Sequence, residues 1–240
     1  DITDDLCVFG LFGPKSRDLI KTLSEDNFDN ENFKFGTAKY ITIEDTKIWC
    51  QRLSYVGELG YELYVDFKDA KKIYELIINK GKDFNLSNCG MHAMDIMRME
   101  SGFLHWGHDI SPEENQFQAG LSFTISNKKD VDFIGKKSLE NIKKENQKSR
   151  FTMFTLKDSE PGKPLLLHDE PIYIDDKIIG RSTSGNYSFN FKKNLVFGYI
   201  KSELSNDELK SKNLFIEVEK QKYPIVVQSG PLKRTDFKNL

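Results

Sequence analysis

The second half of the chain consists of short runs of β-forming residues, and this pattern constrains the fold most. Turn residues such as Pro161-Gly162 and Asp175-Asp176 separate the runs. Short strands at this spacing predict a small antiparallel barrel or sandwich. We expect the strands at Phe151–Leu156, Pro171–Ile174, Ile178–Ser184, Leu195–Ile200, Leu214–Glu219 and Tyr223–Val227.

The first half mixes strand and helix patterns, so the chain as a whole is predicted to be α+β. In the clearest helix Ala70, Ile73, Tyr74 and Ile77 recur at helical spacing up to Lys80. We expect Asp66 or Asp69 to cap this helix, Gly81 to end it in a left-handed conformation and Asn88 to cap the next one. We expect further helices at Pro14–Leu23, Cys89–Ser101 and Gly135–Glu145, and further strands at Leu6–Phe9, Lys39–Ile43, Lys47–Leu53, Glu62–Val65 and Leu121–Ile125.

Composition excludes several classes of partner. The 240 residues carry a net charge of -2, which gives no general attraction to nucleic acid or to an anionic membrane surface. No run of about 18 apolar residues occurs, so we expect no transmembrane helix. The cysteines Cys7, Cys50 and Cys89 are widely spaced and form no metal-ligand pair, which predicts buried thiols in a reducing compartment.

One short connection has the features of a binding loop. Tyr55, Gly57, Gly60 and Glu62 lie close together just before a predicted strand. The glycines allow the main chain to approach a flat ligand. The Glu62 carboxylate can accept two parallel hydrogen bonds from a heterocycle whose amino group and ring N–H lie side by side, as in a reduced pterin. The alternative is a tight β-turn followed by an amphipathic strand, with Glu62 in solvent.

An arginine lies within an unusually methionine-rich stretch. Arg98 belongs to a predicted helix that carries four methionines between Met91 and Met99. A guanidinium buried in such surroundings needs an anion. Asp95, three residues earlier, can pair with it, and so can Glu100 or a ligand carboxylate, and both an internal ion pair and a ligand role remain open.

Two further motifs are given structural interpretations. His105-Trp106-Gly107-His108-Asp109 lacks the ligand spacing of a metal site, so we expect a hydrogen-bonded loop that borders a binding cavity. The residues around Ser184 do not fit the Ser–His–Asp arrangement or the nucleophile elbow of a hydrolase. We therefore expect a turn between strands at Thr183–Ser188.

Together these segments resemble the tetrahydrofolate-binding aminomethyltransferase family, to which the glycine cleavage T-protein belongs. Gly13–Arg17 resembles its GPKSR turn, and Asp95–Glu100 resembles its D-x-[LM]-R-x-E motif. The resemblance implies that Tyr55 and Glu62 contact the folate and that Arg98 belongs to the active site. Phe123 stands where T-proteins often carry a tryptophan that lines the cavity. Barrel-like segments at Ile179–Gly185 and Lys193–Tyr199 continue the match.

The segment from His105 to Ile110 is closer to one subgroup, the C-terminal half of dimethylglycine and sarcosine dehydrogenases. In these proteins a flavin domain precedes the folate domain and produces an iminium that folate traps. The resemblance therefore implies tetrahydrofolate as cofactor, FAD only in a preceding domain joined in cis, and an N-methylated glycine as substrate. From the charge and the motif spacing we expect no nucleic acid, membrane or metal partner, and we expect a cytoplasmic location, or the mitochondrial matrix if the protein is eukaryotic.

One departure from the family matters. The family's catalytic aspartate precedes the GPKSR turn, and the setting of Asp1, Asp4 and Asp5 does not match its motif. We therefore expect a C-terminal fragment with a truncated folate-binding domain at 1–145, a barrel domain at 150–240 and no catalytic residue of its own. The alternatives are a stand-alone T-protein-like enzyme, a sulfonium demethylase and a non-catalytic folate-binding module.

Overall fold

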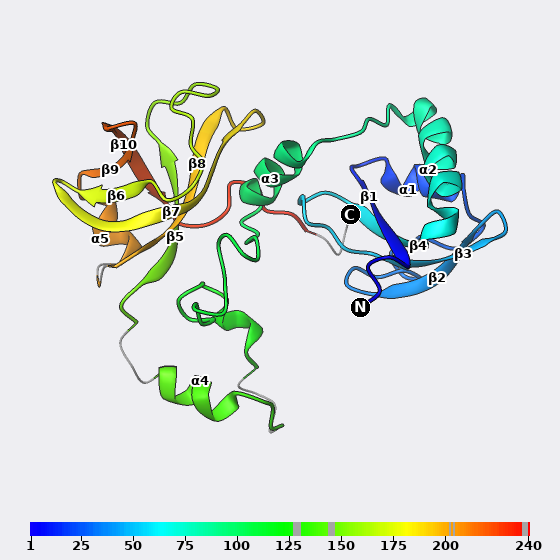
Figure 1. Cartoon of the computed structure of the whole chain (residues 1–240), viewed down its shortest axis with the longest axis horizontal. Helices are drawn as coiled ribbons and strands as arrows, with labels where there is room; N and C mark the ends of the chain where they lie inside the picture. Colours follow the sequence, from blue (N-terminus) through cyan, green and yellow to red (C-terminus); the bar gives the residue numbers. More distant parts are fainter. Residues whose placement is uncertain (127–130, 144–146, 202, 204, 237–239) are drawn as a thin grey trace. The chain divides into compact units, whose positions relative to one another are not determined.

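The structure is a computed structural model that describes residues 1–126, 131–143, 147–201, 203, 205–236 and 240. It contains two compact units (Figure 1). Unit 1 combines residues 1–101 with residues 233–240, and unit 2 comprises residues 102–232. Within the described residues, no helix is both long and apolar enough to cross a membrane.

Unit 1 is built on a four-stranded antiparallel sheet with the order β1-β4-β3-β2. Side chains alternate between its two faces, so Tyr61, Leu63 and Val65 of β4 are buried in the core whereas Glu62 and Tyr64 point to the opposite face. The strands are β1 (Leu6–Phe12), β2 (Ala38–Ile43), β3 (Thr46–Gln51) and β4 (Gly60–Asp66).

Helices α1 (Ser16–Lys21) and α2 (Phe67–Gly81) pack on the sheet of unit 1, and a short 3-10 turn, η1 (Lys82–Phe84), follows. The helical pattern around Ile73 is confirmed. The predicted left-handed end at Gly81 is wrong, because Gly81 is still helical and Asn85 takes the left-handed conformation. A Cβ on Gly81 would lie 2.4 Å from a Leu86 side-chain carbon, so close packing explains this glycine.

Helix α3 (Met91–Glu100) begins later than predicted. Gly90 precedes its first residue, and Asn88 is not the cap, because its side-chain amide donates to the Tyr74 hydroxyl at 2.7 Å. Gly102 has a φ of 74° and follows the helix as predicted.

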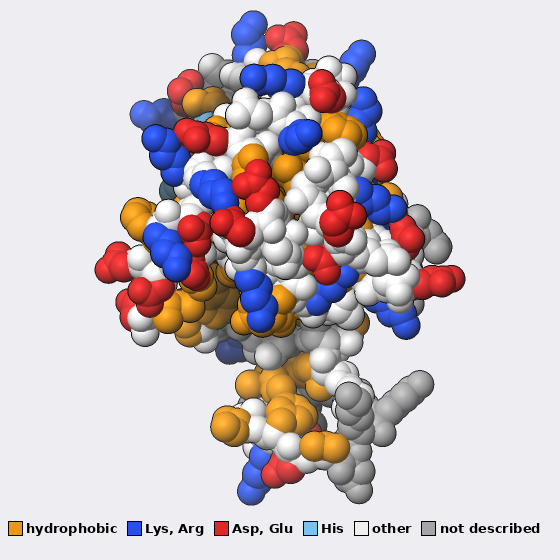
Figure 2. Space-filling view, turned by 90° about the vertical axis from the view of Figure 1, so that its right-hand side faces the viewer, with side chains coloured by type: hydrophobic (Ala, Val, Ile, Leu, Met, Phe, Trp, Pro, Cys, Tyr) orange, Lys and Arg blue, Asp and Glu red, His pale blue; other side chains and the backbone are white. Residues whose placement is uncertain are grey.

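On the face of the protein shown in Figure 2, Lys and Arg side chains are interspersed with Asp and Glu side chains. This distribution agrees with the small net charge of the whole chain, -2.

Unit 2 contains a closed barrel with the strand order β10-β5-β8-β7-β6-β9, all of whose pairings are antiparallel. All six predicted strands are confirmed, and with them the α+β class and the barrel. The strands are β5 (Arg150–Leu156), β6 (Pro171–Ile174), β7 (Lys177–Ser188), β8 (Lys193–Ile200), β9 (Leu214–Val218) and β10 (Gln221–Gln228). Its core contains Phe154, Leu156, Ile172, Val196, Ile216 and Val227.

The rest of unit 2 contains α4 (Lys136–Lys143), α5 (Asn206–Lys210) and a 3-10 turn, η2 (Ser122–Thr124). The strand predicted at Leu121–Ile125 is therefore wrong. The Thr124 N–H bonds to the Leu121 carbonyl at 3.0 Å, and this local bond replaces a partner strand. The end of the predicted helix Gly135–Glu145 lies outside the described residues. The predicted domain boundary between 145 and 150 also differs from the unit boundary and stays a prediction.

The turn predicted at Thr183–Ser188 is wrong, because these residues form the end of β7. Their polar character misled the prediction. The register of β7 shifts between Ser182 and Ser184, and the hydroxyls of Thr183 and Ser184 both donate to Asp109, at 2.5 and 2.8 Å. The hydroxyls that resemble a turn motif therefore serve a buried hydrogen-bond acceptor.

The cysteines differ in their access to solvent, and this predicts a selective reaction. Cys50 is buried in the core of unit 1, as predicted, whereas Cys89 is exposed, so the prediction of a buried thiol is wrong there. Burial raises the pKa of the Cys50 thiol to about 12. We therefore expect iodoacetamide at about pH 8 to alkylate Cys89 and to spare Cys50 until the protein is unfolded. Mass spectrometry of the labelled peptides measures this.

The raised pKa of the Cys50 thiol also makes the stability of the fold depend on pH. The fold favours the protonated thiol, so its contribution is complete below the unfolded pKa of about 9 and is lost as the pH rises toward 12. Rapid alkylation of Cys50 in the folded protein would contradict both expectations.

Candidate functional site

The predicted binding loop connects β3 to β4 and lies against the GPKSR turn. The carbonyl of Leu59, near the end of the loop, accepts from the Gly13 N–H at 2.8 Å and from the Ser16 hydroxyl at 3.2 Å. At the other end of the loop Arg52 is buried, with 1% of its surface exposed. The turn and the loop, which are separate motifs in the sequence, are therefore one structural element.

Gly57 forms the tightest point of this loop. Its φ of +70° is a conformation that side chains other than glycine rarely adopt. A Cβ at this position would lie 1.9 Å from the Ser101 hydroxyl oxygen, just after the end of α3. The loop main chain is thus in direct contact with the end of the helix that carries Arg98.

Tyr55 and Glu62 are both half-buried, but they belong to different elements, the loop and strand β4. Tyr55 lies in the loop between Arg52 and Gly57. Glu62 lies on β4 opposite Gly10 and Gln51, on the face of the sheet away from the core.

The Glu62 carboxylate is oriented by its neighbour. Its Oε2 accepts a hydrogen bond from the Tyr64 hydroxyl at 2.9 Å. Burial and this bond raise the pKa of Tyr64, so the phenol keeps its proton and remains a donor. A carboxylate held in this way is suited to accept hydrogen bonds from a planar ligand.

Arg98 is buried and forms the ion pair that the sequence allowed. Its Nε and one terminal nitrogen donate to Oδ1 of Asp95 at 2.9 and 2.7 Å, while only 1% of the arginine side chain is exposed. This supports the internal ion pair. Arg98 also lies less than one helical turn before Ser101, where α3 contacts the loop, so its expected ligand role stays a prediction.

Phe123 belongs to unit 2, in the 3-10 turn η2, with 80% of its surface exposed. A large aromatic side chain that is so exposed is suited to contact a ligand or another surface. Because it belongs to a different unit from Tyr55, Glu62 and Arg98, its expected role in lining a folate cavity stays a prediction.

The segment around Asp109 is a hydrogen-bonded loop, as predicted. Asp109 is buried and accepts from the His105 N–H at 2.9 Å as well as from two hydroxyls of β7. Gly107 and His108 border a cavity of about 730 Å³ in unit 2, together with Arg181 and Tyr199. Within the described residues, no three His, Cys, Asp or Glu side chains are arranged to hold a metal ion.

The contacts that residues after 232 make with the loop and with the end of α3 were not predicted from the sequence. The Lys233 N–H donates to the Glu100 carbonyl at 2.8 Å, its ammonium pairs with Glu58, and the Thr235 hydroxyl donates to the Gly57 carbonyl at 2.8 Å. No local pattern could have indicated these contacts, since the partners lie up to 178 positions apart.

Comparisons with known proteins identify relatives of both halves of the chain. Residues 1–129 match the family described as GCVT N-terminal domain, and residues 150–233 match the glycine cleavage T-protein C-terminal barrel domain. Human mitochondrial dimethylglycine dehydrogenase is 33% identical over 98% of this chain and 27% of its own length. Human mitochondrial sarcosine dehydrogenase is 30% identical over 83% of the chain and 21% of its own length.

The fold has a counterpart among solved structures. The glycine cleavage system aminomethyltransferase T from Bartonella henselae superimposes with a TM-score of 0.78 at 20% identity, over 95% of this chain and 60% of that protein. The chain spans about a quarter of the length of the dehydrogenases that it matches. The matched residues extend over both units, and the chain belongs to the glycine cleavage T-protein family.

Proposed function

We propose that unit 1 binds a reduced folate through Tyr55 and Glu62. The observation that carries this proposal is the Glu62 carboxylate, which lies on the sheet face away from the core and is oriented by the Tyr64 hydroxyl. A reduced pterin places an amino group beside a ring N–H, and a carboxylate can accept both hydrogen bonds at once. The half-buried Tyr55 supplies an aromatic surface or a hydroxyl to the same ligand.

The chain is further proposed to be the one-carbon-transfer part of a larger enzyme, in which a flavin domain in cis oxidises an N-methylated glycine. Tetrahydrofolate would supply the nitrogen nucleophile that attacks the resulting methylene iminium. The residues of this chain would hold and orient the ligand, and such positioning lowers the barrier of the reaction. Support comes from the similarity to dimethylglycine and sarcosine dehydrogenases along nearly the whole chain.

No carboxylate here matches the motif of the family's catalytic aspartate, so the chain alone is proposed to bind folate weakly and to transfer no methylene group. FAD is expected only in the preceding domain. Arg98, which already pairs with Asp95, is proposed to contact the folate from α3, as the family resemblance implies.

Glu62→Gln tests the proposed site directly. The amide keeps the shape of the side chain but can place a donor opposite a ligand donor. We expect the affinity for 5-formyltetrahydrofolate to fall by about 1–3 kcal/mol, that is, by roughly fivefold to 140-fold. Calorimetric titration measures this.

The matched control is Glu75→Gln, on the exposed surface of α2 in the same unit. This variant also loses one negative charge from unit 1, and its affinity for 5-formyltetrahydrofolate should equal that of the unaltered protein. An unchanged affinity in Glu62→Gln would remove Glu62 from the site.

A further inference from the structure

The residues that return to unit 1 after the barrel contact the binding loop at its tip. This returning segment consists of residues 233–236 and Leu240. Thr235 donates to the Gly57 carbonyl at 2.8 Å, and the Lys233 ammonium pairs with Glu58. The main chain of Lys233 is also fixed, because its N–H donates to the Glu100 carbonyl at 2.8 Å.

The ion pair at the loop tip is sheltered from water. The side chains of Lys233 and Glu58 are 23% and 27% exposed. Fully exposed ion pairs contribute little to stability, because water screens them and the ordering of two long side chains costs entropy. Here the lysine stem also lies against the loop, with its Cδ 3.5 Å from the position of a Cβ on Gly57. The pair therefore restrains the loop more than a surface pair would.

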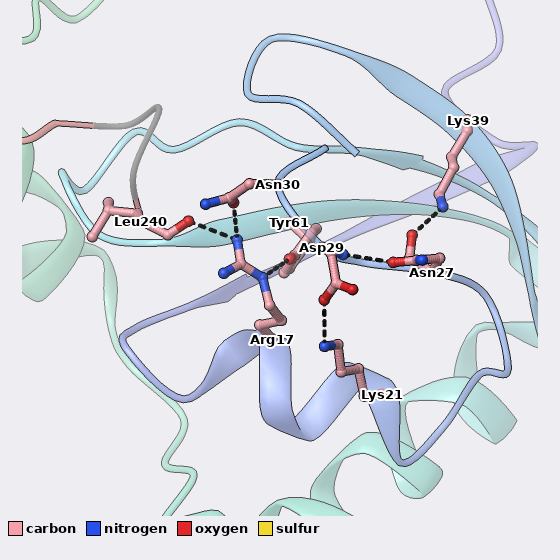
Figure 3. A network of polar contacts seen from close by, with 8 residues as sticks. All are labelled: Arg17, Lys21, Asn27, Asp29, Asn30, Lys39, Tyr61 and Leu240. Carbon is pink, nitrogen blue, oxygen red and sulfur yellow. Dashed lines mark hydrogen bonds and ion pairs between the residues drawn. The ribbon is translucent and has the colours of Figure 1, made fainter. Parts of the chain in front are cut away.

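The returning segment also contacts the start of the loop. The Leu240 main-chain oxygen accepts from one terminal nitrogen of Arg52 at 2.7 Å and from one of Arg17 at 2.6 Å. Arg52 in turn donates to the Phe33 carbonyl at 2.6 Å. Figure 3 shows how Arg17 is held between Leu240, Asn30 and the Tyr61 hydroxyl.

The positive charges of Arg17 and Arg52 explain why both side chains donate to the Leu240 main-chain oxygen. Burial and the neighbouring Arg17 both lower the pKa of Arg52, which means that the two cations repel each other in a partly dry site. An oxygen that accepts hydrogen bonds from both arginines reduces this repulsion. The anchor at the start of the loop is therefore electrostatically favourable.

From these two anchors we infer that the returning segment positions the binding loop and that Lys233 is a positioning residue for Tyr55. Tyr55 lies between Arg52 and Gly57, which are the anchored points. A loop that is ordered before the ligand arrives costs less entropy on binding, and the affinity rises accordingly. The ligand part of this inference rests on the proposed folate site, whereas the ordering of the loop does not.

The test uses Lys233→Met, which keeps the length of the stem and removes the charge. Hydrogen exchange followed by mass spectrometry reports the opening of residues 54–59, and calorimetric titration reports the affinity for 5-formyltetrahydrofolate. We expect exchange of the loop amides to rise about tenfold, with slow exchange retained in β4. Affinity should fall about threefold to tenfold.

Two control variants separate positioning from general stability. Lys233→Arg keeps the positive charge and should restore slow exchange and most of the affinity. Lys21→Met removes a different lysine of unit 1, whose partner Asp29 is 2.7 Å away, and should leave the loop unchanged.

The outcomes distinguish the two proposals. Unchanged loop exchange in Lys233→Met would overturn the inference, whatever the folate result. Faster exchange with unchanged affinity would overturn the positioning of Tyr55. If the unaltered protein binds no folate, the proposed function fails, and the exchange data still decide whether the segment orders the loop.

Discussion

Replacing Asp109 with alanine is expected to destabilise unit 2 by about 3–5 kcal/mol. The buried carboxylate accepts from the His105 N–H and from the hydroxyls of Thr183 and Ser184. The substitution leaves these donors without their acceptor, and an unmet hydrogen bond at a buried position is costly. Urea unfolding followed by circular dichroism measures the loss, and hydrogen exchange in β7 shows whether it lies in unit 2.

Asp158→Ala is the control for this experiment. Asp158 is an exposed residue of the same unit, just after β5, and its removal should change the free energy of unfolding by no more than about 0.5 kcal/mol. If both variants unfolded at the same urea concentration, the hydrogen bonds to Asp109 would contribute nothing net to stability.

Gly57→Ala is expected to destabilise unit 1 by about 2–4 kcal/mol and to abolish the order of the binding loop. Two causes add. The φ of +70° is unfavourable for alanine, and the new methyl group would overlap the Ser101 hydroxyl, 1.9 Å away. Thermal unfolding and hydrogen exchange of residues 54–59 measure the two effects.

Two comparisons separate these causes. Gly36 has a similar φ of +77°, but no atom lies within 4 Å of its Cβ position. Gly36→Ala should therefore show the conformational cost alone, about 1 kcal/mol. Within the described residues the Ser101 hydroxyl has no hydrogen-bond partner, so Ser101→Ala should be tolerated and should recover part of the loss in Gly57→Ala. Equal losses in Gly36→Ala and Gly57→Ala would contradict the overlap.

The sequence predicted the barrel well because its strands are short and regularly interrupted. Each strand is a short run of β-forming residues bounded by turn residues, as at Phe151–Leu156 before Pro161-Gly162, so it is recognisable from its own residues. The predictions failed where a tertiary contact overrides local chemistry. Gly81 is a glycine because Leu86 packs on it. The polar end of β7 is a strand because it pairs with β8 as far as Ser188, and two of its hydroxyls donate to Asp109.

The loop and the strand that carry the candidate site were predictable for a similar reason. Tyr55, Gly57 and Glu62 are close in sequence, so the motif indicates a loop and a strand that the structure contains. The contacts that hold this loop could not be inferred, because Glu58 and Lys233 are 175 positions apart. Hydrogen bonds across such a separation leave no periodic or compositional trace, and one sequence without a structure gives no means of pairing them.

The division of unit 1 into residues 1–101 and 233–240 has a consequence for biosynthesis. The ribosome makes the sheet and the binding loop first, then the whole of unit 2, and only afterwards the residues that contact Gly57 and Glu58. Domains generally begin to fold as they emerge, at about 5–20 residues per second. The barrel can therefore close while the loop still lacks its partners, so the nascent chain acquires an ordered loop only after unit 2 has been synthesised.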